Sequence, residues 1–335
     1  MTAYREKSIE IHPRRPRIRA GRIAFGFMSV FVLALILRNS EIAIHHMSQG
    51  LRLCATSVIP SLFPFMVASE LIVSGGAVQS LGKLLARPMR FLFGIGRESG
   101  CAVMLGLVCG FPIGTRCALT LYRQGKIDHA ELTRLLTFCN MPSSAFLISA
   151  VGVSLFGDRR FGILLYAATL LSAVLIGILG NLFTRKKTTP APTPVPQADV
   201  LVPPSGVAAF PEAIRSSAFA MLQICAFVVF FSAFVGTMEH LPLCQSLSEP
   251  LCALFFGFFE MTGGVARAAA WQAEGAKLMC AFLVGWSGLS VHFQMMSLCA
   301  DERISFRPYF FAKAAHGVLN VLLTFLLTVC IGANQ

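Results

Sequence analysis

Long apolar stretches recur along this chain of 335 residues and limit what it can fold into. A transmembrane helix needs about 20 predominantly apolar residues in a row. Hydrophobic residues make up 55% of the sequence and charged residues only 13%, which leaves too little polar side chain to cover a soluble globule. We therefore predict an all-α fold, that of a polytopic helical membrane protein. The expected apolar segments are Ile23–Leu37, Leu51–Val73, Cys101–Leu121, Leu135–Leu155, Phe161–Phe183, Ala218–Val235, Leu251–Phe259, Leu278–Leu298 and Val318–Ile331.

The stretch from Met1 to Arg22 carries seven basic side chains against two acidic ones, directly before the first apolar segment. Because cytoplasmic ends of membrane proteins are rich in Lys and Arg, we expect a cytoplasmic N-terminus. The small residues of a signal-peptide cleavage site are missing after Leu37, so Ile23–Leu37 is expected to remain as a span. The predicted location is the cell membrane, with the lipid bilayer as partner and no nucleic acid.

A proline-rich segment divides the chain into two halves. Residues 185–206 begin with Arg-Lys-Lys and contain six prolines, a composition that cannot form a membrane helix. The predicted organisation is a basic cytoplasmic N-terminus (1–22), a first membrane half (23–184), a cytoplasmic linker (185–206) and a second membrane half (207–335). Since both basic segments are expected on one side, the first half should cross an even number of times.

Several apolar segments carry Gly or Pro near their middle. The breaks are Ile59–Pro64, Gly110–Gly114 and Asn140–Ser144. Backbone groups freed by such breaks need protein or water partners in the membrane, so re-entrant or broken helices lining a site are expected. A hairpin at Gly110–Gly114 leaves four crossings, near residues 23, 55, 135 and 161. An ordinary proline kink is the alternative for any single break.

The second half repeats some local signals of the first. These signals predict an alignment of the two halves. It pairs Gln124–Ile127 with Asp301–Ile304 and Gly110–Gly114 with Gly285–Gly288. The stretch from Glu70 to Gly76 also resembles the stretch from Glu260 to Gly264. Two halves with matching breaks are typical of transporters built from inverted repeats; chance similarity of glycine-rich segments is the alternative.

Charged and amide side chains are scarce inside the apolar segments, so each is a candidate for a substrate or ion pathway. Arg116 follows Gly114, where a half-helix would begin, and is expected to bind an anion there. Glu260 precedes Thr262 and Gly263, whose unwound backbone would add oxygen ligands. The candidate substrate-binding residues are Gly110, Phe111, Gly114, Arg116, Asn140, Ser143, Glu260, Thr262, Gly263, Trp286, Ser287, His292 and Gln294, and the candidate coupling or gating residues are Glu70 and Glu260. Snorkelling of Arg116 and simple packing of His292 are the alternatives.

Motifs of catalysis or of nucleotide binding are missing from the sequence. It contains no zinc-protease helix, no dinucleotide or Walker loop and no nucleophile elbow. Its 11 cysteines lie mostly in apolar segments and never form a Cys-x-x-Cys pair. We therefore predict no enzyme, no catalytic residue, no metal site and no cofactor, and transport that is passive or driven by gradients.

Five ordered sequence blocks resemble a known family, the YlbJ-like sporulation integral membrane proteins with paired nucleoside-recognition (Gate) domains. The blocks are Val58–Glu70, Gly110–Gly114, Glu131–Asn140, Phe259–Gly264 and Gly285–Gln294. The family is similar in outline to concentrative nucleoside transporters, whose hairpins and broken helices meet at a midplane site. The resemblance implies a role in endospore formation, moving dipicolinic acid across the membrane around the forespore.

Together these observations predict a secondary transporter or facilitator of a small organic anion, by resemblance dipicolinic acid. Arg116 and aromatic walls such as Phe111 and Trp286 would suit a planar dianion. A nucleoside or nucleobase transporter is the alternative, with Glu260, Gln294 and Asn140 as hydrogen-bonding residues and Arg116 structural. A membrane scaffold that recruits partners through its basic segments is the second alternative. Homo-oligomerisation remains open.

Overall fold

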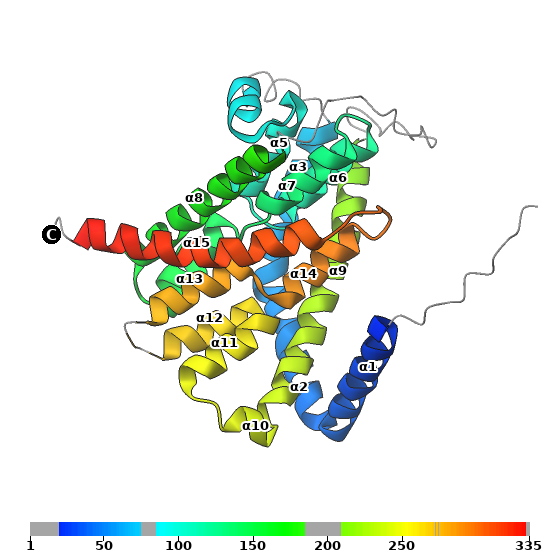
Figure 1. The fold of residues 1–335 in the computed structure, drawn as a ribbon. Helices are drawn as coiled ribbons and strands as arrows, with labels where there is room; N and C mark the ends of the chain where they lie inside the picture. Colours follow the sequence, from blue (N-terminus) through cyan, green and yellow to red (C-terminus); the bar gives the residue numbers. More distant parts are fainter. Residues whose placement is uncertain (1–19, 75–84, 185–208, 272, 274, 333–335) are drawn as a thin grey trace, which may run out of the picture.

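A computed structural model describes residues 20–74, 85–184, 209–271, 273 and 275–332 (Figure 1). Within these ranges the chain forms helices and connecting turns and no strand, which confirms the predicted all-α fold. The predicted basic N-terminus up to residue 19 and the predicted linker from 185 to 206 lie outside the described residues.

The first half contains eleven described elements. They are α1 (Ala20–Arg38), α2 (Ser40–Leu53), η1 (Cys54–Val58), α3 (Ile59–Ser74), η2 (Met89–Phe93), η3 (Arg97–Ser99), α5 (Gly100–Val108), α6 (Ile113–Arg123), α7 (His129–Phe138), η4 (Phe146–Leu155) and α8 (Arg159–Thr184). The second half follows with α9 (Ala209–Glu239), α10 (Pro242–Gln245), α11 (Glu249–Phe259), α12 (Met261–Ala270), α13 (Ala276–Trp286), α14 (Gly288–Leu298) and α15 (Arg307–Gly332).

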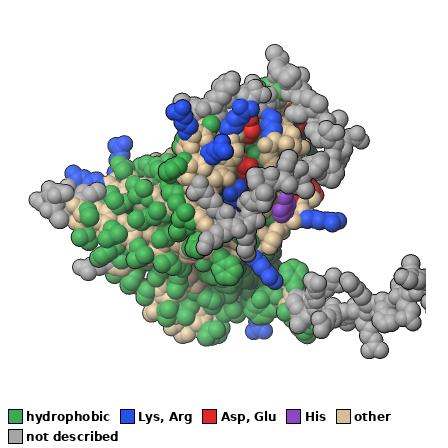
Figure 2. Space-filling view, turned by 45° about the horizontal axis from the view of Figure 1, so that its top comes forward, with side chains coloured by type: hydrophobic (Ala, Val, Ile, Leu, Met, Phe, Trp, Pro, Cys, Tyr) green, Lys and Arg blue, Asp and Glu red, His purple; other side chains and the backbone are tan. Residues whose placement is uncertain are grey.

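Four described segments are long and apolar enough to cross a membrane: Arg159–Phe183, Ala209–Glu239, Ala276–Leu298 and Arg307–Cys330. Two bent helix pairs raise the number to six if each pair is one span. In one of these pairs, the helix from Ile23 to Arg38, which contains the expected span, is followed by the helix from Ser40 to Thr56 at a bend of 97°. Large apolar side chains lie exposed on α1, α8, α9 and α15, and Figure 2 shows a broad hydrophobic surface with Lys and Arg gathered towards one end. The chain is thus a multi-pass membrane protein.

Two helical hairpins carry their turns inside the molecule. A Cβ atom on Gly114 would stand 2.6 Å from the Cα of Gly106, so α6 folds back along α5 as the glycine break predicts. In the second half, α12 folds back along α11, and a Cβ on Gly264 would meet the Cα of Gly257. Glycine is required at these contacts because any side chain would push the two limbs of the hairpin apart.

Two helices are broken rather than folded back. The break expected at Asn140–Ser144, within the apolar segment Leu135–Leu155, is present, because α7 ends at Phe138 and η4 begins only at Phe146. Pro142 lies in this gap and cannot donate a helical hydrogen bond. In the second half, α13 and α14 are separated by Ser287, which has a left-handed backbone with φ of 73°.

The two halves share an order of elements: a hairpin, a broken helix and a long helix. The long helices α8 and α15 each have 26 residues, and they begin at Arg159 and Arg307. The alignment that pairs these two arginines also pairs Ile113 with Met261, the first residues of α6 and α12. Figure 1 shows α15 crossing the front beside α8, with α11–α13 on one side of it and α5–α7 on the other.

The alignment of the two halves predicted from the sequence is therefore wrong. It pairs Gly110, at the turn of a hairpin, with Gly285–Gly288, where a helix is broken but continues. The accompanying comparison of Glu70 with Glu260 fails too, because Glu70 lies inside α3 and Glu260 at a hairpin turn. A glycine break looks alike in sequence whether the chain reverses or continues, so local similarity misled the pairing.

Candidate functional site

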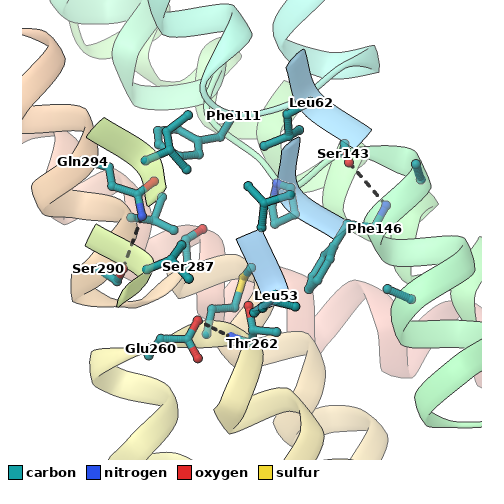
Figure 3. Close-up of a pocket in the computed structure, with 18 of the residues that line it drawn as sticks. Leu53, Leu62, Phe111, Ser143, Phe146, Glu260, Thr262, Ser287, Ser290 and Gln294 are labelled. Carbon is teal, nitrogen blue, oxygen red and sulfur yellow. Dashed lines mark hydrogen bonds between the residues drawn. The ribbon is translucent and has the colours of Figure 1, made fainter. Parts of the chain in front are cut away.

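Both hairpin turns and both helix breaks meet at one cavity of about 640 Å³ (Figure 3). The segment from α2 to α3 and one face of α9 complete its wall. The residues lining it are Leu53, Thr56, Val58, Pro60, Leu62, Phe111, Pro142, Ser143, Ala145, Phe146, Ser149, Ala150, Ile224, Val228, Glu260, Met261, Thr262, Ser287, Ser290, Val291 and Gln294. The cavity is thus built from both halves of the chain.

The lining is mainly apolar, with a small set of polar side chains. Glu260 is the one charged residue among the described residues that line the cavity. Hydroxyl groups come from η1, η4, α12, α14 and both helix breaks, and Gln294 adds an amide that donates to Ser290 at 3.2 Å. A mostly apolar pocket with a few convergent polar groups is typical of a small-molecule site.

Glu260 caps the second hairpin. Its Oε1 accepts the backbone N–H of Thr262 at 2.9 Å, and its Oε2 accepts that of Gly263 at 2.6 Å. The carboxylate therefore satisfies two free N–H groups and the positive end of the dipole of α12. A partly exposed negative group thus stands at the turn in the position that an anionic ligand would otherwise take.

The turn of the first hairpin is tied to the break between α7 and η4. The N–H of Phe111 donates to the carbonyl of Met141 at 2.8 Å. Further along the break, Ser143 accepts the N–H of Phe146 at 3.2 Å and faces the cavity (Figure 3). Gly110 has φ of 77°, and a Cβ there would stand 2.6 Å from the N of Ser143, so only glycine allows this close contact.

The break between α13 and α14 lies against the second hairpin in the same way. Ser287 keeps its left-handed backbone although it is not glycine, a conformation that costs energy and clusters at functional sites. A Cβ on Gly288 would stand 2.8 Å from the N of Met261, beside Glu260. The beginning of α14 and the beginning of α12 are thus neighbours at the cavity.

The structure brings six of the candidate residues to the cavity wall. Sequence reasoning named them from four separate breaks, and Figure 3 shows them around one space. They are Phe111, Ser143, Glu260, Thr262, Ser287 and Gln294.

Arg116 and Glu70 do not line the cavity. The guanidinium donates to Glu70 at 3.3 Å, to Ser216 at 2.7 Å and to Ser217 at 3.4 Å. It therefore joins α6 to α3 and α9 instead of pointing at a ligand in the cavity, so the expected placement of Arg116 at the site is corrected. The start of α6 at Ile113 was near the expected position, but the side chain of Arg116 bonds to α3 and α9 and does not line the cavity.

The remaining candidates lie behind the wall or in the turns. Asn140 accepts from Thr115 and donates to the carbonyl of Leu136. His292 is buried against Tyr309, with Nδ1 at 2.8 Å from the hydroxyl, and Trp286 stacks on Phe258. Gly110 and Gly114 lie at the turn of the first hairpin, and Gly263 lies at the turn of the second.

Sequence reasoning missed several groups in and near the cavity. Ser149 and Ser290 carry no signal in an apolar segment, because serine is common in membrane helices. Lys313 is fully buried in α15, yet it lies before Val318, outside the apolar segment that was expected there. A helical projection of α15 from Arg307 would have placed it on the inner face.

Comparison with known proteins supports the resemblance. The chain is 27% identical over 328 aligned residues to "Sporulation integral membrane protein YlbJ" of Bacillus subtilis (strain 168), with 89% of this chain and 80% of the relative covered. Neither a family model nor a solved structure matches the chain. The predicted likeness to YlbJ-like proteins is confirmed, and so is the multi-pass membrane location.

Proposed function

We propose that the chain is a secondary transporter or facilitator that binds a small organic solute in the cavity between the two hairpins. The observation that carries the proposal is the meeting of two hairpin turns and two helix breaks at one cavity. Transporters built from repeats hold their substrates between discontinuous helices at the interface of the repeats. Movement of one half against the other would then expose the cavity alternately to the two sides.

The electrostatics of the cavity bear on the class of substrate. Within the described residues, Glu260 is the one charged group in the lining, and no Lys, Arg or His faces it. An uncharged polar solute such as a nucleoside or nucleobase fits this lining. Glu260 and Gln294 would hydrogen-bond its hydroxyl or amide groups, and Phe111 and Phe146 would offer faces for a planar ring.

Dipicolinic acid is the second candidate, because the relative named above is a sporulation protein. A free dianion would meet the carboxylate of Glu260 without a basic partner in a mainly apolar lining, which is unfavourable. Such a substrate would enter with its charge neutralised, either protonated or bound to a divalent cation. On either reading we propose that the protein acts in sporulation, as its relative does.

The test is uptake into proteoliposomes that contain the purified protein. Radiolabelled uridine and radiolabelled dipicolinate are supplied in parallel, the latter with and without Ca²⁺, and with or without proton and sodium gradients. Uptake of uridine supports the favoured substrate class. Uptake of dipicolinate that increases with Ca²⁺ or with acid supports the second. If neither solute enters vesicles that hold folded protein, the transporter proposal is wrong and the scaffold alternative gains.

A further inference from the structure

Lys313 lies fully buried in the middle of the protein. Its exposed fraction is 0%, and its Nζ donates to the backbone carbonyl of Asn140 at 2.9 Å. Among the described residues, no carboxylate lies within ion-pair distance of it. A buried ammonium without a counter-ion is unfavourable unless other groups compensate for its charge, so this lysine calls for an explanation.

The acceptor of Lys313 is a carbonyl at a helix break. Asn140 follows the end of α7 at Phe138, where the dipole of the helix presents its negative end. In transporters with broken helices, such unwound carbonyls and half-helix C-termini coordinate the coupling Na⁺ or H⁺. The ammonium of Lys313 stands where a coupling cation would stand, but it is tethered to α15.

The groups around Lys313 include few that titrate. The imidazole rings of His292 on α14 and His316 on α15 interact electrostatically with Lys313. The hydroxyl of Tyr309 on α15 is hydrogen-bonded to His292. Cys139 at the end of α7 precedes its acceptor. α8 and α13 contribute groups that do not titrate. The carbonyl of Thr169 on α8 lies 3.1 Å from His316, and the carbonyl of Ala281 on α13 accepts from Asn320 at 2.8 Å.

The other half of the chain provides an internal comparison. The alignment that pairs the start of α8 with the start of α15 also pairs Leu165 with Lys313. Leu165 is also fully buried, and it packs with Leu283 and Val284 at the end of α13. An apolar side chain thus fills the corresponding position at the second break, so packing alone does not require a lysine at the first.

We propose that Lys313 is the proton-binding site that couples transport to the proton gradient, an inference that rests on the transporter function proposed above. With its proton, the Nζ holds the Asn140 carbonyl through a charge-assisted hydrogen bond. When the Nζ gives up its proton to water, a neutral amine remains and its hydrogen bond to the carbonyl becomes weaker.

The cavity is connected to this bond through the chain. Met141, next to Asn140, accepts the N–H of Phe111 from the first hairpin, and Ser143 lines the cavity. A change in the hydrogen bond between Lys313 and the Asn140 carbonyl would therefore displace both a hairpin turn and a wall of the cavity. Protonation of Lys313 and occupancy of the cavity would in this way influence one another.

The test separates coupling from transport in proteoliposomes. Counterflow of radiolabelled uridine or dipicolinate, whichever is exchanged, measures transport without a gradient, and accumulation under an imposed proton gradient measures coupling. Wild-type protein is expected to accumulate the solute with the proton gradient and not with a sodium gradient. In Lys313→Met, counterflow is expected to persist while proton-driven accumulation falls by about tenfold or more. Leu165→Met, the matched control, should keep both activities.

Lys313→Arg provides a second variant in case the methionine protein does not fold. Arginine keeps the charge but does not release a proton, so counterflow without proton-driven accumulation is again expected. Proton-driven accumulation at the wild-type level in either folded variant would overturn the proposal. Wild-type counterflow without any response to the proton gradient would also overturn it and would leave the transporter function intact. Absence of counterflow in the wild type would overturn both.

Discussion

The Oε2 atom of Glu260 accepts the backbone N–H of Gly263 at 2.6 Å, at the beginning of α12 and beside the cavity. The other oxygen accepts the N–H of Thr262, so the side chain both caps a helix and provides the charge of the cavity. A substitution at this position therefore acts on stability as well as on function, and the two effects need separate measurements.

Glu260→Gln is expected to lower the free energy of unfolding by about 1 kcal/mol, since an amide offers one acceptor oxygen to the two N–H groups. Thermal unfolding in detergent measures this change. Solute uptake by the folded variant is expected to fall as well, because the one charge of the lining is lost. Thr262→Ser, which leaves both backbone bonds in place, is the control and should unfold like the wild type. An unchanged Tm in Glu260→Gln would contradict the capping role.

Gly114→Ala is expected to destabilise the protein through the first hairpin. The added Cβ would clash with the carbonyl oxygen of Cys139 and would stand 2.6 Å from the Cα of Gly106, so the backbone must move. Overpacking of this kind costs about 1–3 kcal/mol. Gly26→Ala on α1 is the matched control, since nothing lies within 4 Å of its added Cβ. Equal Tm values for the two variants would show that the hairpin does not need this contact.

Arg116→Ala is expected to lower the free energy of unfolding rather than to remove a group that binds the substrate. The guanidinium is nearly buried and bonds Glu70, Ser216 and Ser217, so its loss leaves a carboxylate without its partner. Removing one member of a buried pair costs about 3–5 kcal/mol. In the double variant Arg116→Ala, Glu70→Ala part of the lost stability should return. A double variant that is less stable than Arg116→Ala alone would contradict this structural role.

The ion pair between Asp158 and Lys277 predicts a dependence of stability on pH. The side-chain hydrogen bond from Lys277, at 2.7 Å, and the backbone N–H of Phe161 lower the pKa of Asp158 below its ordinary value. The pair connects the start of α8 to the start of α13, so it links the two halves. Its contribution is present in full above the unfolded pKa of about 4. It is lost as the pH falls through the lowered folded pKa.

The difference in Tm between the wild type and Asp158→Asn is therefore expected to be largest near neutral pH and to shrink in acid. The effect is modest because both partners are partly exposed to solvent. Asp301→Asn is the control, since that side chain is 90% exposed and should give little difference at any pH. A difference for Asp158→Asn that grows in acid would contradict the assignment.

Much of the fold follows from patterns that are local in the sequence. The apolar length of Phe161–Phe183 predicts α8, and Gly110–Gly114 predicts the bend between α5 and α6. Whether a glycine break reverses the chain depends on contacts between distant residues, such as Gly106 with Gly114 and Cys139. The break at Asn140–Ser144 was predicted correctly, but for that reason the predicted alignment of the two halves was wrong.

The candidate site was predictable where a break carries its own polar group. Glu260, Ser287 and Ser143 lie in breaks, and the breaks meet at the cavity. Arg116 was misplaced because its direction depends on Glu70 and Ser216, which are far away in sequence. Scarcity of charge identifies the side chains that need partners in a membrane, whereas tertiary packing decides which partners they find.

The proposed function requires that the solute binds in the cavity between the two hairpins. Ser149 lines the cavity from η4, whereas Ser154 lies exposed on the same helix and outside the lining. Uptake of radiolabelled uridine and dipicolinate by Ser149→Trp and Ser154→Trp, both reconstituted as folded protein, tests whether the solute binds there. The indole of Ser149→Trp should fill the cavity and reduce uptake by about tenfold or more, while Ser154→Trp transports like the wild type. Equal uptake by the two variants would contradict the claim.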